Sequence, residues 1–127
     1  ISDDAAEDLL TRRFNIINIW RSIAGPVQTT PLAVCDATTI SQGQLITAER
    51  RTKDRVGYTQ AMTFNSDNKW YYFSDMRRNE ALLIKTYESN EHKYGGPSGH
   101  SAFKNTSAPS DALPRESIET RVFAFFK

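Results

Sequence analysis

The pattern of apolar and polar side chains predicts a chain built from many short strands with little helix. Residues 14–20 are rich in β-branched and aromatic side chains, which favours a largely buried strand. Residues 58–64 and 117–126 alternate between two sets of positions, which is the period of a strand with one face toward a core. Shorter strands are predicted at residues 32–35, 44–50, 69–73 and 81–87.

Helical patterns are confined to the start of the chain and to one later turn. Residues 3–13 are predicted to form a short helix, because acidic side chains stand near its first turn and Arg12 and Arg13 near its last. A capped single turn of helix is predicted at residues 74–80, and residues 88–99 are expected to be irregular. These elements predict a mainly β fold, a sandwich or a jelly-roll barrel, with a short N-terminal helix.

Length and composition indicate one domain without a strongly charged partner. The 127 residues fit a single domain, and 16 basic residues against 15 acidic ones give a net charge of +1. This balance argues against nucleic acid as a partner, and no apolar run approaches the ~20 residues needed to span a membrane. Cys35 is the single cysteine, so we expect no internal disulfide and a reducing, cytoplasmic location.

The first residues suggest a piece of a longer protein. The sequence begins with Ile1 rather than methionine, and its opening residues have the character of the interior of a helical segment. We therefore expect residues 1–127 to be a single domain that forms the C-terminal part of a longer one.

His100 and the segment that follows it are the main candidates for a binding site. His100 stands between Gly99 and Ser101, small neighbours that leave room for a metal ion, although taken alone it is more typical of an exposed loop histidine. Arg115 and Ser117 lie two residues apart and point to the same side of an extended strand. A guanidinium fork beside a hydroxyl suits a carboxylate.

Other residues compete for these roles. Arg121 is a second candidate for binding an anion, but Glu119 shares its face of the predicted strand, so an internal ion pair is the competing interpretation. The competing interpretation of Arg115 is a surface arginine that pairs with an acidic neighbour, Glu116 or Asp111. Trp20 and Arg21 end a strand before a proline-rich loop and are weaker candidates for the wall of a substrate pocket, since an aromatic residue there is more often part of the core.

Several segments, taken in order along the chain, resemble one enzyme family. They are residues 14–21 (FNIINIWR), 25–27 (GPV), 31–36 (PLAVCD), 70–73 (WYYF), 79–85 (NEALLIK), 99–103 (GHSAF) and 114–121 (PRESIETR). Together they resemble the fungal hydroxylase/desaturase family that is related to the cephamycin methoxylation protein and to gibberellin-desaturase-like enzymes. The resemblance covers nearly the whole chain, which makes it more specific than any single motif.

The resemblance implies an oxidoreductase that uses Fe(II) and 2-oxoglutarate on a double-stranded β-helix and hydroxylates or desaturates a small secondary metabolite. It implies that His100 is the distal iron ligand, that Arg115 and Ser117 hold the distal carboxylate of 2-oxoglutarate, and that no catalytic residue is needed beyond the metal. Two departures stand out. No His-x-Asp pair occurs in the sequence, and Asn68 stands where the family usually has a histidine.

The missing His-x-Asp pair leaves two other interpretations open. One is a metal-free relative that uses the same scaffold as a binding or interaction module, or for a cyclisation or isomerisation without a redox step. The other is completion by a missing N-terminal segment or by a second copy in a homo-oligomer, which predicts an exposed sheet edge at residues 14–20.

Overall fold

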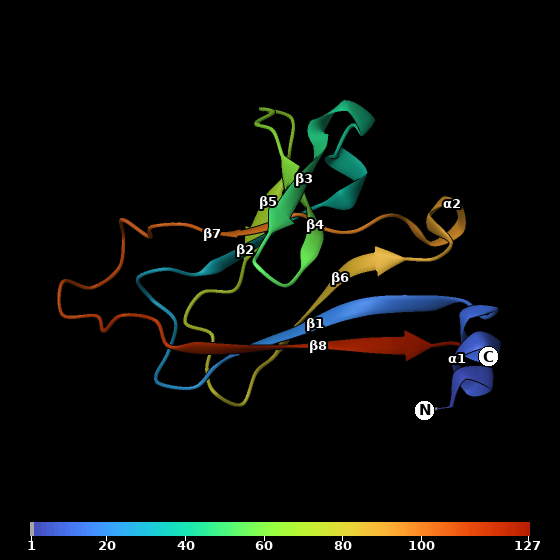
Figure 1. Ribbon diagram of the computed structural model, residues 1–127. Helices are drawn as coiled ribbons and strands as arrows, with labels where there is room; N and C mark the ends of the chain where they lie inside the picture. Colours follow the sequence, from blue (N-terminus) through green and yellow to red (C-terminus); the bar gives the residue numbers. More distant parts are fainter. Residues whose placement is uncertain (1) are drawn as a thin grey trace.

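The structure, a computed structural model, describes residues 2–127 and confirms the mainly β prediction (Figure 1). It contains few helices, and most of its regular structure is strand. The helices are α1 (Asp3–Leu10) and α2 (Glu91–Tyr94), with 3-10 turns at Ala37–Thr39 and Gln42–Gln44. The strands are β1 (Phe14–Ser22), β2 (Leu32–Cys35), β3 (Leu45–Arg51), β4 (Val56–Met62), β5 (Trp70–Tyr72), β6 (Leu82–Glu88), β7 (His100–Ala102) and β8 (Ser117–Phe125).

The longest strands form one antiparallel sheet in the order β6-β1-β8. β1 pairs with β8 along its whole length, from Phe14 opposite Phe125 to Ser22 opposite Ser117. On its other side β1 pairs with β6, with a register shift between Ile16 and Ile17. β1 is therefore central, and the exposed edge predicted for residues 14–20 is wrong: residues distant in sequence supply a partner on each side.

A second, smaller antiparallel sheet has the order β5-β2-β7. Its central strand β2 places Val34 opposite both Tyr71 of β5 and His100 of β7. His100, taken alone typical of a loop, begins a strand, because residues 100–102 pair with the side of β2 that β5 leaves open. This arrangement of two antiparallel sheets is that of the double-stranded β-helix that the family resemblance implies.

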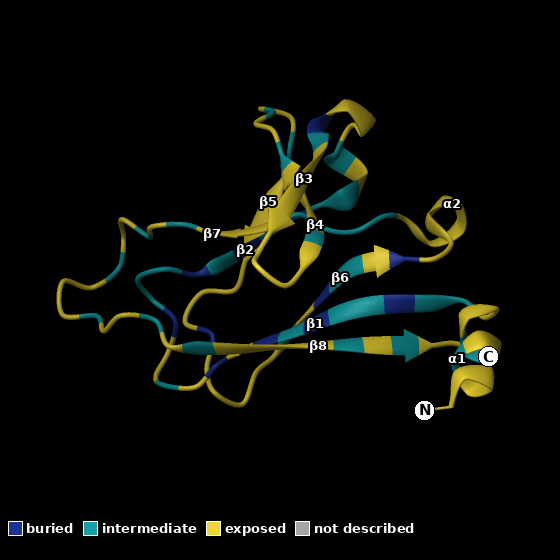
Figure 2. Cartoon of the chain, in the orientation of Figure 1, coloured by how far each residue is buried: buried dark blue, intermediate teal, exposed yellow. Residues whose placement is uncertain are grey.

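The sheets share a small core. Trp20 of β1 and Ile84 of β6 pack with Val27 and Met76, and the partly buried Leu32, Val34 and Leu82 complete the cluster. Val27 and Met76 also form an isolated antiparallel bridge, which brings the two loops together. Figure 2 shows that burial is concentrated along β1 and its surroundings, while the outlying segments are exposed.

The residues around Met76 correct one prediction. Residues 74–80 form turns rather than a helical turn. Asp75 has a φ of 53°, in the left-handed region, which a right-handed helix excludes. The burial of Met76 in the core fixes this path, because the side chain has to reach Trp20 and Val27.

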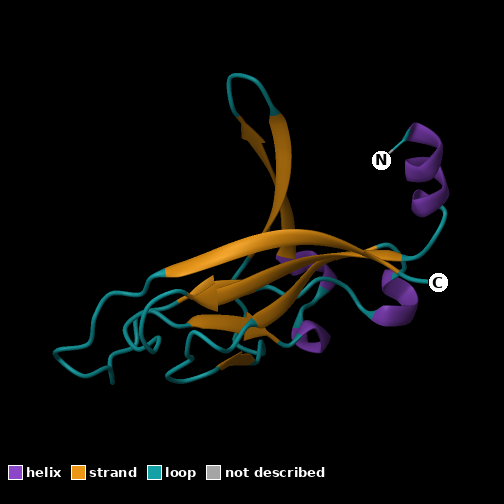
Figure 3. Cartoon of the chain, turned by 90° about the horizontal axis from the view of Figure 1, so that it is seen from below, coloured by secondary structure: helices purple, strands orange, loops and turns teal. Residues whose placement is uncertain are grey.

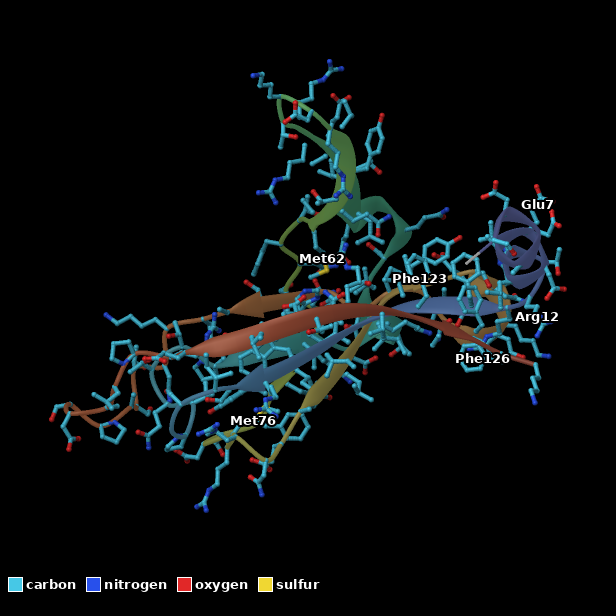
Figure 4. All side chains as sticks on the ribbon, turned by 60° about the horizontal axis from the view of Figure 1, so that its bottom comes forward. Glu7, Arg12, Met62, Met76, Phe123 and Phe126 are labelled. Carbon is cyan, nitrogen blue, oxygen red and sulfur yellow. The ribbon has the colours of Figure 1, made fainter. Side chains whose placement is uncertain are left out.

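Strands β3 and β4 form a hairpin that projects from the rest of the chain (Figure 3). They pair with each other from Leu45 opposite Met62 to Arg51 opposite Val56. All of β3 beyond Leu45 is exposed, and Met62 lies at the base of the hairpin (Figure 4). The exposed residues 52–55 form the tip of this hairpin.

An ion pair between Arg13 and Glu88 lies at the end of the larger sheet where β1 begins and β6 ends. Arg13 donates two hydrogen bonds to the buried carboxylate of Glu88, at 2.8 and 3.1 Å, and its guanidinium lies 3.6 Å from the ring centre of Tyr94 and 4.0 Å from that of Phe126. These hydrogen bonds hold the pKa of Glu88 below its usual value and raise the pKa of Arg13. The pair ties the start of β1 to the end of β6.

No helix within residues 2–127 is long and apolar enough to cross a membrane, and the longest, α1, has 8 residues. None of its residues is buried, and it ends at Leu10 rather than at residue 13. The chain turns there because the Thr11 hydroxyl bonds the Asp8 carbonyl at 2.7 Å and residues 14 onward enter β1.

Candidate functional site

A cavity of about 1000 Å³ lies between the two sheets and the base of the hairpin. The larger sheet contributes Asn18, Glu119 and Arg121 to its wall, and the smaller sheet contributes His100. The hairpin adds an apolar side that includes Tyr58 and Met62. Residues far apart in the sequence therefore meet in one space, such as Asn18 and Arg121, which are 103 positions apart.

The His100 side chain is held at the rim of this cavity by its backbone surroundings. Because residues opposite one another in a ladder share a face, His100 lies on the same side of the smaller sheet as Val34, which packs on the core. Its Nδ1 lies 3.3 Å from the Ser98 carbonyl, and the Ser98 hydroxyl donates to the Cys35 carbonyl at 2.6 Å. A proton on Nδ1 leaves the Nε2 lone pair available to a metal, which is the usual arrangement of a ligating histidine.

Arg121 enters the same cavity from β8. It stands directly opposite Asn18 of β1, and its Nε donates a hydrogen bond to Asn18 Oδ1 at 3.0 Å. Asn18 Nδ2 donates in turn to Glu119 Oε1. Within residues 2–127 the Arg121 guanidinium forms no ion pair, so the internal pairing with Glu119 that the sequence left open is not what the structure contains.

Arg115 lies in a different place from the one the sequence suggested. It comes before β8 rather than on it, and it lines a second cavity of about 480 Å³ among the loops around residues 22–28 and 109–116. Its Nη1 donates to the Thr30 carbonyl at 2.8 Å, and its guanidinium lies 5.6 Å from the ring centre of Trp20. The expected meeting of His100 with Arg115 is therefore not found.

Ser117 also stands apart from His100. It begins β8 opposite Ser22, is half-buried, and is absent from the walls of both cavities described above. The sequence argument placed Arg115 and Ser117 on one face of a strand, but the strand starts only at Ser117. Proline at position 114 and the loop before it set the direction of Arg115 instead.

Trp20 and Arg21 do not line the cavity that contains His100. Trp20 is 4% exposed and belongs to the core cluster, so its expected role in a pocket wall is replaced by packing. Arg21, its neighbour on β1, points to the other face and is exposed. The alternation of the strand thus turns Arg21 away from the site, whereas Trp20, on the same face as Asn18, is kept from it by its packing in the core.

The described residues do not by themselves complete a metal site. Within residues 2–127, no group of three or more histidine, cysteine, aspartate or glutamate side chains is placed to hold a metal ion. His100, with one ring nitrogen engaged by a carbonyl and the other available, fits the role of a single ligand. The metal-donor set of this segment is thus one imidazole, because the Arg121 guanidinium in the same cavity wall has no lone pair to offer a metal.

Asn18 and Asn68 are polar residues of the cavity whose roles the sequence did not reveal. The available signal for Asn18 was an amide in the middle of an apolar strand, a position where a buried polar group needs partners. Asn68, at the position where a histidine was expected, donates to the Thr39 carbonyl and accepts from Gln44 Nε2, each at 2.7 Å. At Asn68 the amide therefore ties three segments of the wall together.

The chain is similar to several known proteins. A family model described as an oxidoreductase/YMDC permease-like domain matches residues 1–125. Aspirochlorine biosynthesis protein N of Aspergillus oryzae is 35% identical over 126 residues, which cover 98% of this chain and 53% of that protein. The hydroxylase/desaturase asaB of Aspergillus flavus is 35% identical over 136 residues, covering 96% of this chain and 60% of that protein.

The most informative relative has both a sequence and a solved structure. The Fe(II)/2-oxoglutarate-dependent dioxygenase nvfI of Aspergillus novofumigatus is 38% identical over 119 residues, covering 92% of this chain and 42% of that protein. The structure of the iron and alpha-ketoglutarate-dependent endoperoxidase NvfI matches with a TM-score of 0.87 at 36% identity, over 98% of this chain and 46% of that one. The chain spans about half the length of the relatives that it matches.

Proposed function

This chain belongs to the family of fungal hydroxylase/desaturases and Fe(II)/2-oxoglutarate-dependent dioxygenases, and from that premise we propose that it forms the cosubstrate-binding part of such an enzyme. The enzyme would oxidise a small secondary-metabolite intermediate. One observation carries the proposal: His100, with one ring nitrogen available, and Arg121, whose guanidinium forms no ion pair with residues 2–127, line the same cavity.

In this proposal His100 is one ligand of the iron and Arg121 binds the distal carboxylate of 2-oxoglutarate. A guanidinium presents parallel N–H donors that match the two oxygens of a carboxylate, and it stays charged at every physiological pH. Bound iron and dioxygen would supply the chemistry, in which 2-oxoglutarate loses CO₂ to give succinate while a C–H bond of the substrate is hydroxylated or desaturated. The role of Arg121 replaces the one first expected for Arg115 and Ser117.

The rest of the cavity suits a small-molecule substrate. Its volume of about 1000 Å³ is at the upper end of ordinary ligand pockets. Tyr58, Met62 and Trp70 give it apolar and aromatic surface, while Asn68 and Gln60 add uncharged polar groups. These side chains would exclude water from the region next to His100 and orient an apolar substrate there.

The activity is assigned to an enzyme of the relatives' length, in which further iron ligands come from polypeptide outside residues 1–127. It also requires that residues 1–127 form the C-terminal part of a larger domain, and this stays a prediction. A homo-oligomeric state and a cytoplasmic location also stay predictions.

The proposal is tested by iron binding and 2-oxoglutarate turnover in the natural full-length protein. We expect His100→Ala to abolish stoichiometric Fe(II) binding and to lower turnover by about 100-fold or more, because a catalytic metal loses one of its few protein ligands. His92→Ala is the matched control, since His92 is the other of the two histidines and lies in α2, outside the cavity wall. It should leave both quantities unchanged.

Two results would overturn the proposal. If His100→Ala retains iron and turnover, the ligand assignment is wrong. If the natural protein binds neither Fe(II) nor Mn(II) but still binds a small molecule in the cavity, the metal-free alternative is correct.

A further inference from the structure

We propose that Asn18 is a positioning residue that keeps the Arg121 guanidinium open to an anion by standing between it and Glu119. The inference rests on the proposed function, because it concerns the same anion site. It gives β1 a part in cosubstrate binding, in addition to the parts proposed for His100 of β7 and Arg121 of β8.

The geometry of the three side chains carries the inference. Asn18 is 2% exposed, whereas Glu119 and Arg121 are exposed. The Asn18 amide uses both of its ends: its oxygen accepts from Arg121 Nε at 3.0 Å, and its nitrogen donates to Glu119 Oε1. A buried side chain thus holds two oppositely charged partners in fixed places.

The same arrangement explains why Glu119 and Arg121 do not pair with each other. They lie two residues apart on β8 and therefore on one face of the sheet, within reach of long side chains. An amide is a side chain that offers an acceptor to a guanidinium and a donor to a carboxylate at once. Asn18 satisfies one N–H of the arginine and one oxygen of the glutamate. Direct pairing of Arg121 with Glu119 would have to break these two hydrogen bonds.

The bond to Nε has a second effect on Arg121. A guanidinium has five N–H donors in a rigid plane, of which one is on Nε and the others on the two Nη atoms. With Nε fixed by Asn18, the plane is held while the Nη donors have no partner among residues 2–127. They are the donors that a bidentate carboxylate uses.

The rigidity of β1 supports this role. Asn18 sits in the central strand of the larger sheet, directly opposite Arg121 on one side and Ile84 on the other. Ile84 is 1% exposed and belongs to the core. The Asn18 side chain is therefore held in one position by its packed surroundings. Through its hydrogen bond it also restricts the orientation of the Arg121 guanidinium.

The test measures 2-oxoglutarate binding by calorimetry in the natural full-length protein without added iron. We expect Asn18→Leu to weaken binding about tenfold or more, because Glu119 then captures the guanidinium. Adding Glu119→Gln to that variant removes the competitor and should restore affinity to within about threefold of the natural protein. A loss that the double variant does not restore would overturn the proposal.

Asn15→Leu is the matched control. Asn15 is the other buried asparagine of β1, at 6% exposure, and it lies beside Glu88, outside the cavity wall. This substitution tests whether any loss of a buried amide from β1 disturbs binding. We expect it to lower stability while leaving the affinity for 2-oxoglutarate unchanged, and an equal loss of affinity would overturn the proposal.

A ligand-independent measurement separates this inference from the proposed function. In protein labelled with ¹⁵N-arginine, the Arg121 Nε–H should exchange slowly with solvent, and Asn18→Leu should make it exchange rapidly. Asn18→Asp, which preserves size if the leucine variant does not fold, should keep slow exchange but weaken anion binding through its added charge. Rapid exchange in the natural protein would overturn the inference, whereas slow exchange without any binding of 2-oxoglutarate would leave the positioning intact and overturn the proposed function.

Discussion

Two arginines six residues apart, Arg115 and Arg121, occupy two regions of the molecule that differ in how they satisfy a charge. At Arg115 the guanidinium donates to a backbone carbonyl and lies over the ring of a core tryptophan. At Arg121 one N–H is held by an amide and the rest of the guanidinium faces an open cavity. Each guanidinium makes one hydrogen bond among residues 2–127, and the two differ in surroundings: Arg115 lies against a core ring, and Arg121 faces the cavity that contains His100.

The difference teaches how to separate a structural cation from a binding one. Both residues are arginines in the same segment, and each makes one hydrogen bond among residues 2–127, so residue type and hydrogen-bonding capacity do not distinguish them. Their surroundings do: Arg121 shares a cavity with His100, whereas Arg115 lies against Trp20 and lines a separate, smaller cavity. A cation in the same cavity as a candidate metal ligand is the one placed to bind an anion that also reaches the metal.

The strongest way to break the comparison is to remove the ring beneath Arg115. Trp20→Ala should lower the free energy of unfolding by about 3–5 kcal/mol, because a large buried side chain leaves a cavity in a small core. Urea unfolding measures this loss. Trp70→Ala is the matched control: Trp70 is 43% exposed and lines the cavity with His100, so its removal should cost much less stability.

Equal losses of stability in the two tryptophan variants would contradict the assignment of Trp20 to the core. The chain contains two tryptophans, so the remaining one reports unfolding by fluorescence in each variant. The two tryptophan variants therefore compare the core around Trp20 with the cavity wall around Trp70.

Matched substitutions of the two arginines sharpen the comparison directly. Arg121→Gln should weaken 2-oxoglutarate binding by about 10- to 100-fold, because a charge-assisted pair of hydrogen bonds is lost. Arg115→Gln should leave that affinity unchanged but lower the melting temperature by about 3–5 °C, since a hydrogen bond and a contact with Trp20 are lost. Calorimetry and thermal unfolding measure the two quantities.

The reverse result would return the cosubstrate to the site first expected from the sequence. If Arg115→Gln abolishes binding and Arg121→Gln does not, the anion belongs in the smaller cavity. Binding that survives both substitutions would place it elsewhere.

The smallest expected effect tests how tightly the site wall is packed beside His100. A Cβ at Gly99 would lie 3.2 Å from Met62 Sδ and 3.7 Å from Cys35 Cβ. Gly99→Ala should therefore cost about 1 kcal/mol, because the flexible Met62 side chain has to shift. Adding Met62→Ala should remove most of the clash, and a double variant whose loss equals the sum of the two single losses would contradict this contact.

Much of the fold could be predicted from the sequence, because strand periodicity is local. The apolar run at residues 14–20, the short run at 32–35 and the closing alternation all became strands near the expected bounds. The turn at 74–80 could not be predicted, since its backbone follows the burial of Met76 against residues from distant parts of the chain. The central place of β1 was missed for the same reason.

The site was predicted less well because it depends on where a strand starts and on what stands across from it. The spacing of Arg115 and Ser117 placed both on one face only if the strand already included residue 115, and it begins two residues later. Whether Arg121 pairs with Glu119 was decided by Asn18, about a hundred positions away in the sequence. The sequence singled out His100 as a candidate, but it did not show which other residues line the same cavity.

The projecting hairpin of β3 and β4 has a consequence for how such a protein diversifies. Its strands pair with each other and with no other strand among residues 2–127, yet Tyr58 and Met62 form part of the wall of the cavity that contains His100. Substitutions in this hairpin would reshape the cavity while the sheets that carry the imidazole and the guanidinium stay as they are. Under the proposed function, selection could thus change which molecule is oxidised without changing the residues that bind the metal and the cosubstrate.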